Sequence, residues 1–203
     1  MTSVIGGMHD RYVMTRRVRI LSDYIGSRIP QGSRVLDVGS GDGTIARTIA
    51  DARPDISVEG VDVLVRPATA IPTRQYDGLH LPFDDDSVDV VMLVDVLHHT
   101  PDPGAVLREA ARVTRDRVVI KDHLTDRWGS WPILRFMDWV GNAPHGVALP
   151  YNYQSHAQWL ELLAQAGLRV EEWCDHLNLY PPPASWIFGG SLHVLITAVP
   201  APT

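Results

Sequence analysis

The stretch RVLDVGSGDGTIA, residues 34–46, decides the fold. Residues 34–38 form a short apolar run that predicts a buried strand, and a helix is predicted to begin at Thr44. Between them lies a turn with three alternating glycines, Gly39, Gly41 and Gly43. Glycine permits positive φ and the close approach of a ligand to bare main chain, and a helix start presents free N–H groups. A strand, a glycine turn and a helix in this order are typical of the cofactor site of an open α/β sheet.

The spacing of the glycines indicates the kind of cofactor. A dinucleotide fold carries G-x-G-x-x-G, which brings a pyrophosphate to the helix N-terminus. This chain reads G-x-G-x-G, with Thr44 in place of the third glycine, and Asp42 inside the turn would repel a diphosphate. A cofactor without a phosphate therefore suits this turn better.

A second strand is predicted at residues 57–63, with an acidic residue, Asp62, near its end. Asp62 follows Gly43 by nineteen residues, about where a fold of this kind places a carboxylate for ribose hydroxyls. A carboxylate only accepts hydrogen bonds and can hold both hydroxyls of a diol. The alternative is an ordinary aspartate of a turn.

Composition and charge narrow the class of protein. The 203 residues, 45% hydrophobic and 21% charged, predict one globular domain over residues 1–203. We expect no membrane partner, since no apolar run approaches ~20 residues. The N-terminus has no signal pattern, and the single cysteine, Cys174, suits a reducing cytoplasm. The net charge of −6, with Lys121 as the one lysine, argues against a nucleic-acid partner.

The motif D-x-G-x-G-x-G at residues 37–43 resembles the first motif of class I S-adenosylmethionine (SAM) methyltransferases. In residues 76–103, the arrangement D-x-x-x-LPF-x-D-x-S-x-D resembles the small-molecule branch of these enzymes, the type 11-like branch that includes quinone-biosynthesis methyltransferases. The resemblance covers about residues 34–120. It implies an α/β fold with a Rossmann-like, doubly wound, mainly parallel sheet of seven strands. It also implies SAM as methyl donor and S-adenosylhomocysteine as product.

The resemblance further implies which residues hold the cofactor. They lie in the glycine turn, after the second strand, beside the adenine, after the strand at residues 88–94, and on a leading helix that covers the pocket. In that order they are Asp37, Gly39, Ser40, Gly41, Asp62, Val63, Asp77, Gly78, Leu79, Val94, Asp95, His99 and Arg16. Within residues 9–29, the leading helix, an arginine could meet the cofactor carboxylate, or its charge could simply be solvated.

One segment departs from the family pattern. Residues 63–75 are few and are interrupted by Pro67 and Pro72. We therefore expect a loop or a single turn here, with hardly room for the usual crossover helix and third strand.

The later elements follow from local signals. Residues 88–94 are almost continuously apolar, as in a strand buried on both faces of a parallel sheet. Asp102 before Pro103 predicts a capped helix start, and residues 155–158 form a capping box. Further strands are predicted at 117–120, 168–173 and 192–199, and the last two form an edge hairpin in the resembling family. The proline-rich residues 180–186 predict a stiff loop.

Residues 124–154, after the fifth strand, depart from the core pattern and hold half of the six tryptophans. Aromatic side chains with interspersed polar groups suit an apolar pocket for a small organic molecule. We interpret this helical, aromatic insertion either as a substrate lid or as a segment that packs on the core or on a second subunit. The partners expected are therefore a small-molecule acceptor and, as an open alternative, a second copy of the chain.

The candidate catalytic residues lie at and after the end of the fifth strand. Transfer of the methyl group would be an in-line displacement, and a hydroxyl or carbon acid would also need its proton removed. His123 is the first candidate base and Asp122 could orient it, with His145 and His99 as alternatives. An acceptor with a low pKa needs no base, and these histidines would then only shape the pocket. We expect no metal: residues 84–86, three aspartates, predict a solvated turn.

Three other functions compete with this interpretation. A nicotinamide-dependent reductase shares the fold but lacks support from the glycine spacing. A nucleic-acid amine methyltransferase needs an Asn/Asp-Pro-Pro-aromatic motif where this chain reads LVDVLHH, residues 93–99. A non-catalytic SAM-binding partner of another enzyme would keep the same cofactor motifs, and no sequence feature excludes it.

Overall fold

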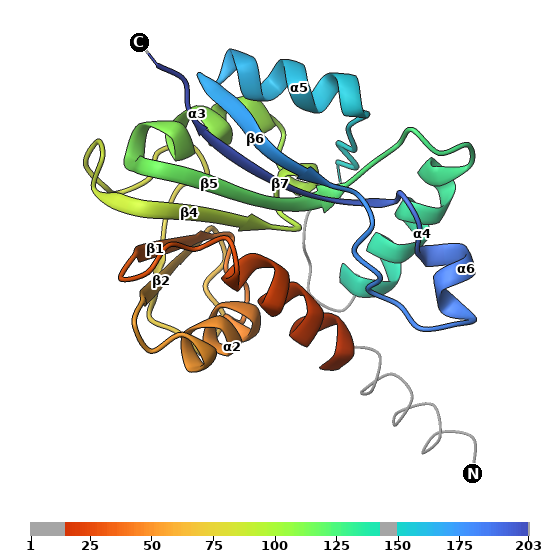
Figure 1. The fold of residues 1–203 in the computed structure, drawn as a ribbon, viewed down its shortest axis with the longest axis horizontal. Coiled ribbons are helices and arrows are strands. Elements are labelled where there is room, and N and C mark those ends of the chain that lie inside the picture. The colour runs from red at the N-terminus through yellow and green to blue at the C-terminus, as the bar shows by residue number, and fades with distance from the viewer. Residues whose placement is uncertain (1–14, 143–149, 203) are drawn as a thin grey trace.

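The computed structural model describes residues 15–142 and 150–202 (Figure 1). These residues form a seven-stranded sheet in the order β3-β2-β1-β4-β5-β7-β6. The strands are β1 (Arg34–Val38), β2 (Ser57–Asp62), β3 (Thr73–Gln75), β4 (Val88–Val94), β5 (Thr114–His123), β6 (Leu168–Cys174) and β7 (His193–Pro200). Pairing is parallel from β3 to β5, while β7 runs antiparallel to both β5 and β6. The predicted mainly parallel α/β sheet and its terminal hairpin are confirmed.

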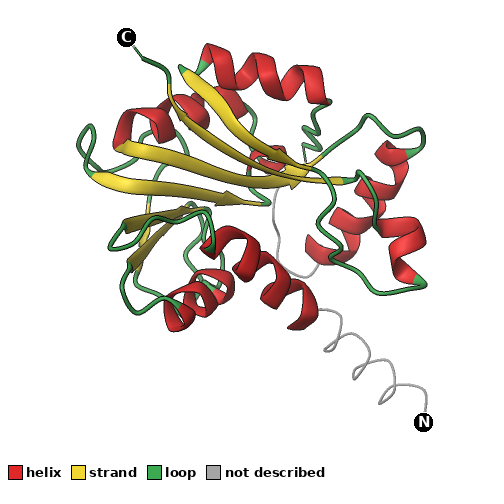
Figure 2. Ribbon diagram, in the orientation of Figure 1, coloured by secondary structure: helices red, strands yellow, loops and turns green. Residues whose placement is uncertain are grey.

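Helices cover both faces of the sheet (Figure 2). A helix over residues 15–26 and α2 (Thr44–Ala52) lie on one face, and α3 (Pro103–Val113) and α5 (His156–Gln165) on the other. Near the carboxyl ends of β5 and β6 lie α4 (Ser130–Asn142) and α6 (Ala184–Phe188). Within the described residues, no helix combines the length and apolar character needed to cross a membrane.

The core consists of two apolar clusters, one on each face of the sheet. Residues of β4 alternate between them: Val91 packs with α3 and α5, and Met92 packs with α2 and the helix 15–26. Burial on both faces explains the continuous apolar sequence of this strand.

Helix starts follow the predicted signals. The Asp102 carboxylate accepts from the Ala105 amide at 2.9 Å, with Pro103 in the first turn of α3. At α5, Ser155 and Gln158 form the reciprocal capping box. Both caps satisfy N–H groups that a helix start leaves without an intrahelical partner.

Two expectations need correction. A third strand is present, because β3 pairs with β2 in parallel, although the connection between them is an irregular loop without a helix, as predicted. The Gly60 amide donates to the Pro72 carbonyl at 2.8 Å. This hydrogen bond holds the start of β3 at the edge of the sheet, and the proline takes part in it only as an acceptor. The proline-rich loop, in turn, leads into a short helix, α6.

Candidate cofactor and active site

The glycine turn has the backbone that its sequence predicts. Gly39, Gly41 and Gly43 have φ of 73°, 59° and 74°. A Cβ at Gly39 would lie 2.6 Å from Cγ2 of Val96, and one at Gly43 would lie 2.8 Å from Cγ1 of Ile71. At Gly41, the atom nearest to an added Cβ is Nη2 of Arg66, at 3.7 Å, at the end of a long side chain. The main chain of Gly41 therefore faces the open side of the turn.

Asp62 lies at the end of β2 and contacts this turn directly. Its Oδ2 accepts from the Gly41 amide at 2.8 Å and its Oδ1 from the Leu64 amide at 2.9 Å. These two bonds fix the carboxylate beside the glycine turn, and each oxygen keeps a further lone pair for a hydroxyl. The residues predicted for the cofactor ribose and for the turn are thus in contact.

An exposed apolar wall adjoins Asp62. Val63 and Leu64 are 52% and 59% exposed, and Leu79 is 54% exposed. The loop that carries Leu79 lies against β2, since a Cβ at Gly78 would lie 3.1 Å from Cγ1 of Val63. Large apolar side chains left open beside Asp62, the residue predicted for the ribose, suit a planar base. Asp77 caps its own turn by accepting from the Leu79 and His80 amides, which lower the pKa of its carboxyl to about 2; its contact with the adenine stays a prediction.

Asp37 is buried under the glycine turn at 4% exposure. Burial, together with the nearby charge of Asp62, raises the pKa of its carboxyl to about 8. The folded protein therefore keeps a proton on Asp37 at neutral pH, whereas the unfolded chain releases it near pH 4.

This proton predicts a pH dependence of stability. The free energy of unfolding falls as pH rises from about 4 to 8, because the unfolded state binds fewer protons in that range, with a slope of at most ~1.4 kcal/mol per pH unit. Asp37→Asn, which mimics the neutral acid, flattens this part of the curve. Urea denaturation of both proteins between pH 4.5 and 6.5 measures the difference, with Asp84→Asn, an exposed carboxylate, as control. Parallel curves for wild type and Asp37→Asn would contradict the assignment.

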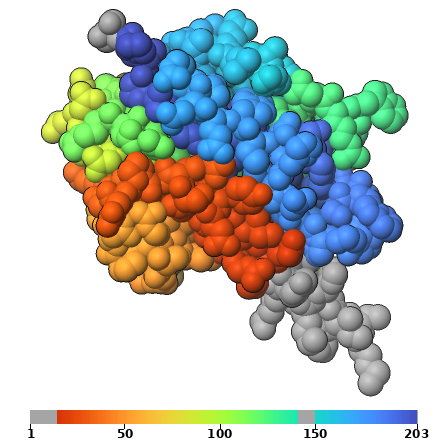
Figure 3. Space-filling view, viewed as in Figure 1, coloured from red at the N-terminus to blue at the C-terminus, as the bar shows by residue number. Residues whose placement is uncertain are grey.

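Two neighbouring arginines of the leading helix have different partners. Arg16 donates to the carbonyl of Asn178 at 3.3 Å, on the segment after β6, and Figure 3 shows these two parts of the chain side by side at the surface. Arg17, its neighbour, instead forms an ion pair with Asp95 after β4. Contact of Arg16 with the cofactor stays a prediction, and Arg17 is a residue that the sequence pattern did not single out.

A polar cluster lies at the carboxyl ends of β4 and β5. Its members are buried or nearly so and come from six segments of the chain: Arg17, Asp95, His98, Lys121, Asp122, His123, Asp138 and Tyr153. At one end, Asp95 forms ion pairs with both Arg17 and the fully buried Lys121. Burial opposes the charge of Asp95, but these two cations keep its pKa well below the usual range.

At the other end of the cluster, His98 of the short helix η1 (Leu97–His99) lies between two carboxylates. Its Nδ1 is 2.6 Å from Oδ1 of Asp122, and its Nε2 is 3.4 Å from Oδ2 of Asp138. Burial alone would lower the pKa of His98, but the charges and hydrogen bonds of the two aspartates raise it to about 10. Tyr153 donates its hydroxyl to Asp138.

His123 ends β5 and is 5% exposed. Its Nδ1 lies 3.3 Å from Oδ1 of Asp122 and 3.4 Å from Nδ1 of His98. Burial, followed by the positive charges of Lys121 and His98, lowers the pKa of His123. The ring is therefore neutral at physiological pH and able to accept a proton.

The other histidines differ in how they relate to this cluster. The His99 ring lies tilted against that of His98, with ring centroids 4.0 Å apart, and burial lowers the pKa of His99. His193, at the start of β7, has its ring centroid 5.2 Å from that of His123. Nδ1 of His99 and Nδ1 of His193 are buried and have no partner among the described residues. His145 lies outside the described residues.

The ligand atoms of His98, Asp122 and His123 lie within 4.8 Å of one another, close enough for a metal ion. The charges of the polar cluster do not require a metal ion. Three carboxylates, Asp95, Asp122 and Asp138, face three cations, Arg17, Lys121 and His98, so the cluster is balanced by its own side chains. A metal would have to displace the proton that His98 holds between its two carboxylates.

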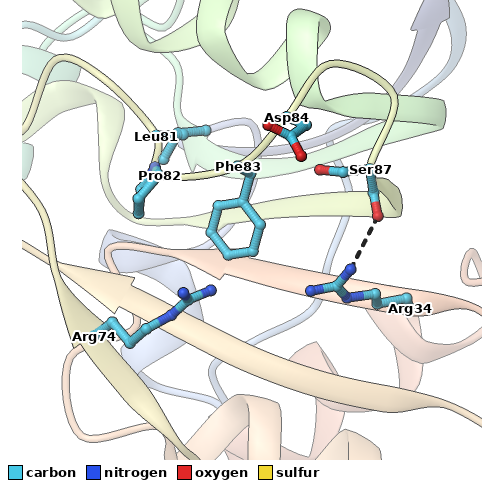
Figure 4. A pocket seen from close by; sticks show the side chains of 7 residues that line it. All are labelled: Arg34, Arg74, Leu81, Pro82, Phe83, Asp84 and Ser87. Carbon is cyan, nitrogen blue, oxygen red and sulfur yellow. Dashed lines mark hydrogen bonds between the residues drawn. The ribbon is translucent and has the colours of Figure 1, made fainter.

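A cavity of about 480 Å³ lies elsewhere, at the amino ends of β1 and β4 (Figure 4). Arg34 and Arg74 both bind Glu59, at 2.7 and 2.9 Å, and the Arg74 guanidinium lies 4.7 Å from the centroid of the Phe83 ring. Ligands of open α/β sheets bind at the opposite, carboxyl ends of the strands. We therefore assign this cavity a structural role.

The sheet order, the glycine turn at the end of β1 and the carboxylate at the end of β2 are those of the class I SAM-dependent methyltransferase fold. A family model described as a methyltransferase domain matches residues 9–172. The chain belongs to this family.

A curated relative agrees with this class. The chain is 34% identical over 185 residues to 27-O-demethylrifamycin SV methyltransferase of Amycolatopsis mediterranei, covering 82% of this chain and 65% of that protein. It spans less than two thirds of the length of the first curated relatives it matches, from 65% for this enzyme to 40% for a methyltransferase of Mycobacterium leprae.

Two solved structures show the shared fold at low identity. Geranyl diphosphate C-methyltransferase from Streptomyces coelicolor, solved with Mg²⁺, geranyl diphosphate and S-adenosyl-L-homocysteine, has a TM-score of 0.66 at 17% identity, with 88% of this chain and 78% of that chain covered. The [4+2]-cyclase SpnF has a TM-score of 0.66 at 18% identity, with 90% and 80% covered.

Proposed function

We propose that the protein transfers the methyl group of SAM to a small, apolar or aromatic acceptor by in-line displacement. The observation that carries this proposal is the contact of Asp62 with the Gly41 amide beside the exposed wall of Val63 and Leu79. At one open edge of the sheet, this arrangement offers a carboxylate that can accept from the ribose hydroxyls, an uncovered main chain, and an apolar surface for the adenine. Alignment of acceptor, methyl carbon and sulfur can supply roughly 7–11 kcal/mol of barrier lowering.

The acceptor is proposed to lie next to His123 and the exposed aromatic side chains of the insertion, residues 124–154. Several aromatic side chains of the insertion are exposed, among them Trp128 at 97% and Trp139 at 59%. Such rings can close over an apolar molecule, and a homodimer contact is the alternative use of the same surface. The name of the Amycolatopsis relative supports a small organic acceptor.

We propose His123 as the group that takes the proton of a hydroxyl or carbon-acid acceptor. Its lowered pKa supports this role, because a base has to be neutral at the working pH. Asp122 orients the ring through Nδ1. His99 is the alternative base on the described residues, and His145 the alternative outside them.

Two other functions are kept as competitors. SpnF, a cyclase with the same fold, supports the possibility of a SAM-binding protein whose reaction is not methyl transfer; such a protein, or a non-catalytic partner, would bind SAM without producing S-adenosylhomocysteine. A nicotinamide-dependent reductase would bind NADH. We propose no nucleic-acid or membrane partner, and a reducing cytoplasm as the location, on the basis of the negative charge and the single cysteine.

Calorimetric titration tests the cofactor. We expect micromolar binding of SAM and of S-adenosylhomocysteine, no heat with NADH, and loss of SAM binding in Asp62→Ala. Asp84→Ala, which removes an exposed carboxylate of a distant turn, is the matched control and should bind as wild type does. A screen of aromatic acceptors for S-adenosylhomocysteine release then tests the transfer. Absence of SAM binding to wild type would refute the proposal.

A further inference from the structure

A line of four polar side chains joins the insertion to the candidate base. Tyr153 donates to Asp138 of α4, Asp138 faces Nε2 of His98, and Nδ1 of His98 faces Asp122, next to His123. His98, Asp122 and Asp138 are 2%, 1% and 6% exposed. Buried charges of this kind are stable only when they are paired and hydrogen-bonded, and here each carboxylate has the imidazole as a partner.

The geometry fixes the protons on His98. A neutral imidazole donates through one nitrogen only, whereas an imidazolium donates through both. Because a carboxylate oxygen faces each ring nitrogen, the charged form satisfies both carboxylates at once. His98 is therefore a fixed positive charge within contact distance of the His123 ring.

The surroundings of His123 then determine which of its nitrogens is free. Oδ1 of Asp122 accepts from the His123 amide at 2.8 Å, is bound to Nδ1 of His98, and lies 3.3 Å from Nδ1 of His123. Nδ1 of His98, 3.4 Å from Nδ1 of His123, already carries a proton. With the His123 proton on Nδ1, on the side of this carboxylate, Nε2 is left as the acceptor. The other titratable groups that face this ring are Lys121 on β5, Asp95 and His98 after β4, His193 on β7 and Tyr153. Asp95 is already paired with two cations, so its negative charge is compensated.

We propose that His98 and Asp138 are positioning residues for His123: the His98 imidazolium fixes Asp122, which orients His123 with Nε2 free, and Asp138 ties this arrangement to α4. The inference rests on the proposed methyl transfer. As the acceptor atom bonds to the methyl carbon, the carbon–sulfur bond breaks and its electron pair stays on sulfur. The acceptor proton moves to Nε2 of His123 and later leaves to solvent. The positive charge of the sulfonium thus ends on His123, beside His98, which already carries a positive charge.

Histidine NMR tests the arrangement without an acceptor. Long-range ¹H–¹⁵N spectra of the full-length protein report the protons on each ring between pH 5 and 9. We expect His98 doubly protonated up to pH 8 or above, and His123 with Nδ1 protonated and Nε2 free at pH 7. Titration of His98 near pH 6.5 in wild type would overturn the proposal, whatever the outcome for SAM binding.

Two variants distinguish a positioning role of these residues from a role in folding. His98→Gln removes the fixed charge, so the pKa of His123 should rise by about one unit or more. Asp138→Asn keeps the His98 ring, and the pKa of His98 should fall; this variant serves even where His98→Gln does not fold. His156→Gln, an exposed histidine on α5, and Asp84→Asn are the matched controls and should leave both pKa values unchanged. An unchanged His123 titration in folded His98→Gln would also overturn the proposal.

Kinetics with an acceptor from the screen complete the test. The acid limb of the kcat profile should move to higher pH in His98→Gln, with SAM affinity kept within twofold. The double variant His98→Gln/Asp138→Asn should lose about as much kcat as the worse single variant, since residues that act as one unit are not additive. Additive losses with an unshifted pH profile would assign both residues a purely structural role.

Discussion

Gly39→Ala should abolish SAM binding and lower the free energy of unfolding by about 2–5 kcal/mol. Two effects add. A left-handed backbone costs a residue with a Cβ about 1–2 kcal/mol, and Gly39 has φ of 73°. The new Cβ would also lie 2.6 and 2.9 Å from the two γ-carbons of Val96, which forces a repacking that costs about 1–3 kcal/mol. Val96 leads into η1, so the shift would spread from the cofactor turn toward His98.

Gly32→Ala is the matched control for this variant. Gly32 has nearly the same φ, 74°, but a Cβ there would meet no atom within 4 Å. Only the backbone cost remains, about 1–2 kcal/mol, and SAM binding should persist. Chemical denaturation and calorimetry of both variants give the comparison. Equal destabilisation of the two would show that the contact with Val96 is unimportant.

Asp95→Ala should destabilise the protein by about 3–5 kcal/mol, the usual effect of leaving a buried charge without its partner. The carboxylate pairs with Lys121, which is 0% exposed, and with Arg17. Its removal leaves two positive charges close together in the interior. Urea denaturation at pH 7 measures the loss, and an exposed ion-pair variant, Asp51→Ala, is the control and should have nearly the stability of wild type.

A second substitution tests the cause. Asp95→Ala/Lys121→Met removes the stranded ammonium and replaces it with an apolar chain of similar length. This double variant should be more stable than Asp95→Ala alone, because exchanging a buried pair for apolar groups is often neutral. A double variant less stable than Asp95→Ala would mean that the buried Lys121 ammonium does not depend on Asp95 for its stability.

The parts of the site that the sequence predicted are those encoded locally. The glycine turn, the strand before it and the caps at Asp102 and Ser155 each depend on residues within a few positions of one another. Asp62 could be placed because its distance from the turn is set by one helix and one strand. The strand β3, in contrast, could not be predicted from local signals. Its three residues carry too little periodicity to be recognised, and only pairing with β2 makes them a strand.

The polar cluster could not be assembled from the sequence. Arg17 and Asp95 are 78 positions apart, and no local pattern distinguishes Arg17 from Arg16. No local pattern marks His98 either, since its two carboxylate partners come from β5 and α4. One signal was available: Asp138 is the single acidic residue in the apolar stretch of residues 131–140, and an isolated acid on an apolar helix suggests a buried partner.

The position of β7 has a consequence for synthesis of the chain. β7 is made after β6 yet lies between β5 and β6, and it bonds to both. While residues 193–200 are still inside the ribosome, β5 has an open edge and β6 has no place in the sheet. Unpaired apolar strand edges invite association with other chains. The nascent chain is therefore open to aggregation in the interval between synthesis of β5 and synthesis of β7, and chaperone capture is expected to be concentrated in that interval.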